Sequence, residues 1–250
     1  MDIQKYLDRI NYSGPLDPSI TTLRALHRAH MFAIPFENLD IHIGRPILLG
    51  EEVFFDKIVE HRRGGFCYEL NGLFAALLHN VGFDVSMLSA GVARPDGGFS
   101  PDFDHMALLV RTDSDWLADV GFGDSFVEPI KLDESTITRD PTAEYGIKTH
   151  GETRILQRRG DSEGTWTPQY RFSLEPHLLS EYEDMCSYQQ TSPESHFTQN
   201  RICSLATPTG RITVTNDKLI ITTDGIREER TIPDETEFKT LLAQHFGIYL

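Results

Sequence analysis

The hydrophobic period of the chain changes at Gly82, and this change constrains the fold more than any other feature. Before Gly82, apolar residues recur every three to four positions, as they do in helices that pack on a core. After it, Phe83, Val85 and Met87 alternate with polar neighbours, as they do in a strand with one buried face. A helical first third followed by strands predicts an α+β protein.

Start and stop signals divide the chain into elements. Pro18-Ser19 precedes one helical stretch, Gly64-Gly65 separates two others, and Asn80-Val81-Gly82 ends the last of them. The predicted helices cover residues 3–10, 20–29, 53–59, 66–82 and 237–246. The predicted strands cover residues 83–87, 105–111, 116–121, 169–174, 211–215 and 218–223.

The charge balance excludes some classes of partner. The chain has 23 Lys and Arg residues against 38 Asp and Glu residues, which gives a formal net charge of −15. Nucleic acids and anionic membranes bind clustered cations, so neither is an expected partner. A small anionic ligand is still compatible with this balance, because backbone N–H groups and a few local cations suffice to bind it.

The cysteines indicate a reducing environment. Cys67, Cys186 and Cys203 are odd in number and widely spaced, which favours free thiols over disulfides or a zinc site. The first residues lack the features of a signal peptide, and no apolar run reaches the roughly 18 residues of a membrane span. We therefore expect a cytoplasmic protein, and the spacing of His, Cys, Asp and Glu predicts no metal site.

Cys67 is a candidate nucleophile. It follows Gly64-Gly65 at the predicted start of a helix, where free N–H groups and the helix dipole favour a thiolate. Arg62 and Arg63 add positive charge nearby, so we expect a thiol pKa below that of a free cysteine. The alternative is that Cys67 is a small buried hydrophobic residue.

His105 and Asp119 are candidates for the base and the group that orients it. They lie on the two arms of the predicted hairpin and share a face only if the loop has an odd length, as residues 112–114 would. A loop of even length would point them apart, and the turn residues allow both. Asp119 lies within an apolar run, where an unpaired carboxylate is costly and an imidazole partner would stabilise it.

These residues belong to four motifs through which the sequence resembles the arylamine N-acetyltransferase family, of the bacterial type. The motifs follow one another in the family's order and at about its spacing, along nearly the whole chain. They are Ile34-Pro35-Phe36-Glu37-Asn38-Leu39, Arg63-Gly64-Gly65-Phe66-Cys67, His105-Met106-Ala107-Leu108-Leu109-Val110 and Asp119-Val120-Gly121-Phe122-Gly123.

The resemblance implies a fold and a division into domains. It implies a helical N-terminal region, a central β-barrel and a C-terminal α/β lid, built on a cysteine-protease-like core. We expect residues 1–82 to carry the nucleophile, residues 83–185 to form the barrel with His105 and Asp119, and residues 186–250 to form the lid.

The resemblance also implies a ping-pong reaction. The Cys67 thiolate would take an acetyl group from acetyl-CoA, and an arylamine, hydrazine or arylhydroxylamine would accept it. Acetyl-CoA is then a co-substrate, and no tightly bound cofactor is expected. His105 would move the protons, Asp119 would stabilise the imidazolium, and the backbone N–H of Cys67 would bind the oxyanion.

Further site residues carry over from the family by position, and they fall into three groups. Glu37 and Arg63 resemble a supporting ion pair, and Tyr188 and Gly123 resemble CoA contacts. The expected walls of the acceptor pocket are Phe36, Phe103, Phe122 and Phe197, for which simple core packing is an equal alternative.

The sequence departs from the family pattern near the expected CoA site. Glu194 and His196 stand where small hydroxyl residues would contact CoA, and the loop over residues 100–104 is unusually acidic. Two other functions are compatible with the same triad residues. One is a cysteine hydrolase, an amidase or esterase on a papain- or transglutaminase-like core, and the other is a non-catalytic relative that binds aromatic ligands. The motifs do not specify the acceptor, the acyl chain length or the oligomeric state.

Overall fold

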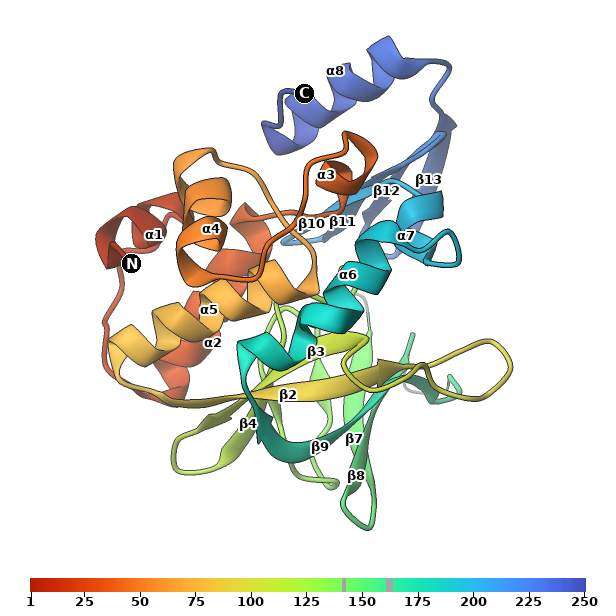
Figure 1. Ribbon diagram of the computed structural model, residues 1–250. Helices are drawn as coiled ribbons and strands as arrows, with labels where there is room; N and C mark the ends of the chain where they lie inside the picture. Colours follow the sequence, from red (N-terminus) through yellow and green to blue (C-terminus); the bar gives the residue numbers. More distant parts are fainter. Residues whose placement is uncertain (141–142, 161–163) are drawn as a thin grey trace.

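The computed structural model describes residues 1–140, 143–160 and 164–250, and it places most helices in the first third of the chain (Figure 1). The helices are α1 (Ile3–Arg9), α2 (Ile20–Ala33), α3 (Leu39–His42), α4 (Glu51–Phe55), the π-helical turn η1 (Asp56–Glu60), α5 (Cys67–Val81), the 3₁₀ turn η2 (Leu179–Tyr182), α6 (Glu183–Thr191), α7 (His196–Gln199) and α8 (Glu235–Phe246). Within these described residues, no helix combines the length and the apolar character needed to cross a bilayer.

Local signals account for the boundaries of the main helices. The Ser19 side chain caps α2 by accepting the N–H of Thr22 at 3.3 Å. Gly82 ends α5 in the left-handed conformation, with φ of 104°, which favours glycine. The helix expected over 53–59 is divided into α4 and η1, because the N–H of His61 bonds the carbonyl of Asp56, five residues back, in a π-helical turn.

An eight-stranded antiparallel sheet forms a nearly closed barrel. Its order is β5-β4-β3-β2-β9-β8-β7-β6, so β9 returns from far along the chain to lie beside β2. The strands are β2 (Asp84–Val92), β3 (His105–Arg111), β4 (Asp115–Ala118), β5 (Ile130–Lys131), β6 (Thr138–Arg139), β7 (Glu144–His150), β8 (Thr153–Arg159) and β9 (Thr167–His177).

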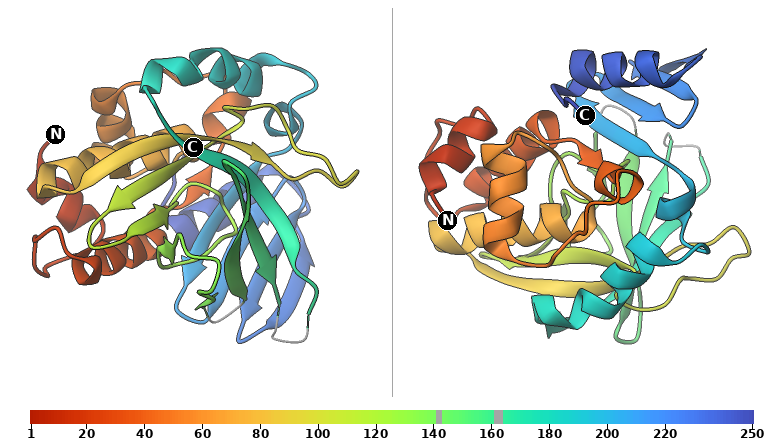
Figure 2. Two further views of the ribbon diagram at one scale, coloured as in Figure 1. Left: turned by 90° about the horizontal axis from the view of Figure 1, so that it is seen from below. Right: turned by 45° about the horizontal axis from the view of Figure 1, so that its top comes forward.

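A second, five-stranded antiparallel sheet joins the N-terminal helical region to the C-terminal part of the chain. Figure 2 shows its blue strands beside the green strands of the barrel, with α8 covering one face. Its order is β1-β10-β11-β12-β13, so the short β1 of the helical region pairs with β10. The expected domain boundary at residue 185 falls inside α6. The strands are β1 (Phe36–Glu37), β10 (Ile202–Thr207), β11 (Gly210–Thr215), β12 (Lys218–Thr223) and β13 (Ile226–Thr231).

Strand β3 is buried on both faces, and its two faces serve different cores. Met106, Leu108 and Val110 belong to the core shared with α5, whereas Ala107 and Leu109 belong to the core inside the barrel. Each large apolar side chain buried in this way contributes about 1.5–3 kcal/mol. The pattern fixes the register, because a slip of one residue would exchange the two faces. The odd-numbered positions of β3 therefore face the barrel interior.

Candidate active site

The β3–β4 hairpin brings His105 and Asp119 together. Arg111 pairs with Asp115 across a three-residue loop, so of the two loop lengths that the sequence left open, the odd one over residues 112–114 forms. Both candidate residues therefore face the barrel interior, and Nε2 of His105 donates to Asp119 Oδ2 at 2.8 Å. Strand β4 ends at Ala118, earlier than expected, because the chain turns at Asp119 and the Gly121 N–H bonds back to its Oδ1 at 2.9 Å.

Cys67 is the first residue of α5 and lines the same cavity as His105. The cavity has a volume of about 1290 Å³. Cys67 and His105 are each 3% exposed and Asp119 is fully buried, so bulk water has little access to the three groups. Because Asp119 takes Nε2 of His105, Nδ1 is the ring nitrogen that remains for a proton from the thiol.

The thiol of Cys67 does not have the lowered pKa that its helix position suggested. Burial raises the pKa of Cys67, and the negative charges of Asp104 and Asp119 add to this effect, while a backbone hydrogen bond from Met106 opposes it. The expectation from the helix dipole was wrong because it ignored desolvation. A thiolate in this site therefore needs a protonated His105 beside it.

Asp119 is held as a carboxylate by several donors. Burial alone would raise the pKa of Asp119, but His105 and hydrogen bonds from Asn71 and Gly121 outweigh it and lower that pKa. Oδ1 accepts from Asn71 Nδ2 at 2.9 Å, and Oδ2 accepts from the Tyr170 hydroxyl at 3.0 Å. The carboxylate is therefore charged and fixed in orientation, as the orienting member of a triad must be.

Three partners of Asp119 escaped the analysis of the sequence. Asn71 had a signal, because it lies one helical turn after Cys67 as an amide among apolar residues of α5. Tyr170 lies 51 residues from Asp119, and His27, which accepts the Asp119 N–H at 3.2 Å, lies 92 residues away. No periodicity links positions so distant, so only the folded chain identifies them.

Three of the four expected aromatic walls line the cavity: Phe36, Phe122 and Phe197. The rings of Phe36 and Phe197 lie 6.0 Å apart, and the ring of Phe122 meets that of His105 edge-on at 5.1 Å. Gly121 allows this loop to approach α5, because a Cβ there would lie 2.8 Å from Cα of Cys67.

Phe103 does not belong to this group. Its ring packs edge-on against His177 at 4.8 Å and against Tyr182 at 5.1 Å, outside the lining of the cavity. Its backbone has a positive φ of 65°, and its carbonyl accepts the hydroxyl of Tyr68 at 2.7 Å. Phe103 thus shapes the loop before His105, and core packing is the alternative that the structure favours for it.

The expected CoA contacts also line the cavity. Tyr188 and Gly123 do so, and so do Glu194 and His196. The acidic loop that precedes His105 is partly neutralised, because Asp102 pairs with Arg171 at 3.0 Å. Asp104 keeps its charge and accepts a hydrogen bond from the amide of Gln189. The cavity further includes the arginines Arg94, Arg158, Arg211 and Arg227, which the sequence analysis did not single out.

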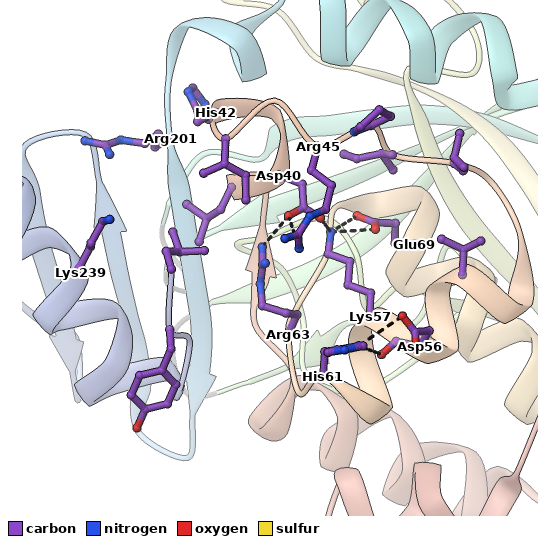
Figure 3. Close-up of a pocket in the computed structure, with 18 of the residues that line it drawn as sticks. Asp40, His42, Arg45, Asp56, Lys57, His61, Arg63, Glu69, Arg201 and Lys239 are labelled. Atoms are coloured by element: carbon purple, nitrogen blue, oxygen red, sulfur yellow. Dashed lines mark hydrogen bonds and ion pairs between the residues drawn. The ribbon is translucent and has the colours of Figure 1, made fainter.

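Glu37 and Arg63 form the expected ion pair, at 2.7 Å, on the other side of α5. They belong to a buried network, and Figure 3 shows four of its members, Arg63, Asp40, Lys57 and Glu69, beside a second cavity of about 800 Å³. Arg63 also pairs with Asp40 at 3.1 Å, and Lys57 joins Asp40 at 2.9 Å to Glu69 at 2.8 Å. Glu69 in turn accepts the N–H of Phe66 at 3.1 Å, so the network supports the first turn of α5, on which Cys67 lies.

No cluster of three or more His, Cys, Asp or Glu side chains suited to a metal ion occurs among the described residues. The three cysteines are free thiols.

Comparison with known proteins agrees with this geometry. The N-acetyltransferase family model matches residues 19–250. The arylamine N-acetyltransferase of Escherichia coli (strain K12) is 34% identical, over 98% of this chain and 88% of its own length. The structure of the Salmonella typhimurium enzyme has a TM-score of 0.92 at 35% identity, covering 98% of this chain and 90% of that one. The Mycobacterium marinum enzyme in complex with CoA has a TM-score of 0.92 at 32% identity, covering 99% and 93%.

These matches confirm the fold class expected from the resemblance, a helical N-terminal region, a β-barrel and a C-terminal α/β lid on a cysteine-protease-like core. They extend over the cavity, the hairpin and the helix that carries Cys67. The chain belongs to the arylamine N-acetyltransferase family.

Proposed function

We propose that this chain transfers the acetyl group of acetyl-CoA to arylamines, hydrazines or arylhydroxylamines through an acetyl-Cys67 intermediate. The observation that carries the mechanism is the placement of Cys67 and His105 in one cavity, with Nε2 of His105 bonded to the buried Asp119 at 2.8 Å. Membership of the family supports the choice of donor and acceptor.

In the first half-reaction, Sγ of Cys67 attacks the thioester carbon of acetyl-CoA while its proton passes to Nδ1 of His105. Burial opposes a lone thiolate, so charge separation depends on the imidazolium that Asp119 stabilises. The N–H of Cys67, in the first turn of α5, donates to the oxyanion. The C–S bond to CoA then breaks, and the CoA sulfur leaves with the proton from His105.

In the second half-reaction, the nitrogen of the acceptor attacks the acetyl carbon on Cys67. Nδ1 of His105 accepts a proton from that nitrogen and returns it to the sulfur of Cys67 as the C–S bond breaks. The product is an amide, and the enzyme regains its thiol. Transfer from sulfur to nitrogen is downhill, whereas exchange between the two sulfurs is nearly balanced.

We assign the two substrates to different walls of the cavity. Phe36, Phe122 and Phe197 offer an apolar surface for the ring of the acceptor. Tyr188 and Gly123 are our proposed CoA contacts, and Arg94 and Arg227 supply cations for its phosphates within a strongly acidic protein. The mechanism requires a reduced Cys67, which suits the cytoplasm.

The test is the intact mass of the protein after brief incubation with acetyl-CoA and no acceptor. We expect a gain of one acetyl group that maps to Cys67, is lost when an arylamine is added, and is absent in Cys67→Ala. An unmodified protein that still acetylates the amine would overturn the covalent mechanism. Consumption of acetyl-CoA at an equal rate without amine would identify a hydrolase instead.

A further inference from the structure

His27 makes two hydrogen bonds to the loop that follows β4. Its ring lies on α2 and is fully buried. Nδ1 lies 2.9 Å from the carbonyl oxygen of Val127, and Nε2 lies 3.2 Å from the backbone nitrogen of Asp119. One side chain thus joins the first and last residues of the segment 119–127.

The chemistry of the two partners fixes the tautomer of His27. A carbonyl oxygen only accepts, so Nδ1 carries the proton, and a backbone N–H only donates, so Nε2 must be unprotonated. A protonated ring would lose the bond to Asp119. Burial lowers the pKa of His27 to about 4, which agrees with a neutral ring at physiological pH.

Packing leaves the His27 ring little freedom to move. It stacks on Phe126 with a centroid distance of 5.6 Å and an interplanar angle of 15°, and it meets the edge of Phe74 at 5.8 Å and 83°. Phe126 belongs to the segment that His27 joins, whereas Phe74 belongs to α5. The ring is therefore a rigid spacer between two helices and the loop.

The segment 119–127 carries two parts of the proposed mechanism. Asp119 provides the carboxylate for His105, and the ring of Phe122 packs edge-on against His105 at 5.1 Å. The Asp119 side chain is oriented by its own donors, but its backbone N–H is held by His27. A shift of this backbone would move the carboxylate and the Phe122 wall together.

We propose that His27 is a positioning residue of acetyl transfer, which acts as a neutral bridge between the Asp119 N–H and the Val127 carbonyl and so fixes both the carboxylate and the Phe122 wall. The inference rests on the proposed role of the Cys67–His105–Asp119 triad. His27 touches neither reacting atom and acts only through the loop.

The first test uses the native protein and detects the bridge directly. Ring-nitrogen NMR of ¹⁵N-labelled protein should show His27 in the neutral Nδ1–H tautomer from pH 5 to pH 8. A ring that is Nε2–H or that titrates near its ordinary pKa would overturn the proposal. This measurement does not depend on whether any variant folds.

The second test compares three variants of α2. His27→Phe keeps a ring on Phe126 but removes both hydrogen bonds, His27→Gln keeps one donor and one acceptor, and His30→Phe is the control. His30 is equally buried on the same helix, but its Nδ1 bonds the hydroxyl of Tyr6 at 2.7 Å, away from the loop.

For His27→Phe we expect kcat/KM to fall by about 10²-fold, because displacement of a catalytic group by roughly 1 Å has that effect. The alkylation of Cys67 by iodoacetamide should also need a higher pH, and the KM of the arylamine should rise. His27→Gln should recover most of the loss, and His30→Phe should keep the native alkylation profile.

A His27→Phe protein whose kcat/KM and alkylation profile match the native ones would overturn the proposal, and so would equal shifts in His30→Phe. Acetylation of Cys67 in the native protein distinguishes failure of the His27 proposal from failure of the proposed triad mechanism. If Cys67 is acetylated while the His27 variants behave as native, only the role of His27 fails. If Cys67 is not acetylated, the triad mechanism itself fails.

Discussion

Helix α5 separates two buried groups of charged residues that differ in how their charges are balanced. On one side, hydrogen-bond donors surround Asp119, and His105 places a positive charge beside it once its ring is protonated. On the other, Arg63 and Lys57 lie between the carboxylates of Glu37, Asp40 and Glu69. The first group is ready for a positive charge that arrives during reaction, whereas the second is already paired.

The difference suggests a division of labour around Cys67. A carboxylate held by neutral donors stabilises an imidazolium when it forms, which serves chemistry. A carboxylate that is already paired with a permanent cation does not gain a further partner during the reaction, so its role is structural. Glu69, which is paired with Lys57, supports the start of α5 in this way. Changes in the first group should therefore affect rate, and changes in the second should affect stability.

Replacement of Asp119 with Asn is the largest expected effect on rate. The amide would turn its NH₂ toward Nε2 of His105, which favours the Nδ1–H tautomer and leaves no base for the thiol. We expect kcat/KM for acetyl-CoA to fall about 10⁴-fold, by analogy with the same change in a serine protease triad. Steady-state kinetics and thermal unfolding of the same preparation would check that rate, and not folding, is lost. A fully active Asp119→Asn protein would contradict the division.

Replacement of Arg63 with Ala should act on stability. It removes the partner of Glu37 and one partner of Asp40, which are both buried, and breaking a buried pair of this kind typically costs about 3–5 kcal/mol. Urea unfolding would measure the loss. Arg45→Ala is the matched control, because Arg45 is 62% exposed and reaches Asp40 only at 3.5 Å, so its loss should cost about 1 kcal/mol or less. Equal losses in the two variants would show that the network is not a paired unit.

Local patterns were sufficient to predict the elements that carry the triad. The 3.6-residue period and the Gly82 signal identified α5, and the hairpin signal identified the two arms that carry His105 and Asp119, whereas the loop length that puts them on one face became clear only from the structure. Both inferences depend only on neighbours within about 15 residues. For the same reason, the motifs placed Cys67 at a helix start but gave the wrong direction for its pKa, since burial is a property of the whole fold.

Elements that depend on distant partners could not be predicted in this way. Strand β1 is two residues long and exists because Phe36 and Glu37 pair with Ser204 and Cys203. Strands β7 and β8 carry many polar residues and lack a clear alternation, so their pairing with each other and with β9 defines them. The hydroxyl of Tyr170 and the ring of His27 likewise contact Asp119 only because the fold brings together residues that are distant in the sequence.

Acid should destabilise the native protein through His30, a buried histidine of α2. Burial lowers the pKa of His30 well below its ordinary value, so the unfolded chain binds a proton below pH 6.5 that the native protein does not. Stability from His30 is thus present above pH 6.5 and is lost as pH falls. Relative to His30→Phe, the native protein should lose about 2 kcal/mol between pH 7 and pH 5. Urea unfolding at both pH values measures this, and a constant difference between the two proteins would mean that His30 titrates normally when folded.

The smallest expected effect separates a hydroxyl that serves Asp119 from one that does not. Tyr170→Phe removes one of the two donors to Oδ2 of Asp119. Because this hydrogen bond is present both before and during the reaction, only part of its energy affects the rate, and kcat/KM should fall about fivefold, which corresponds to about 1 kcal/mol. Tyr145→Phe is the control, because Tyr145 is also fully buried in the barrel but its hydroxyl has no hydrogen-bond partner among the described residues. It should leave the rate unchanged. Equal rates for the two variants would mean that Asn71, Gly121 and His105 orient the Asp119 carboxylate without help from Tyr170.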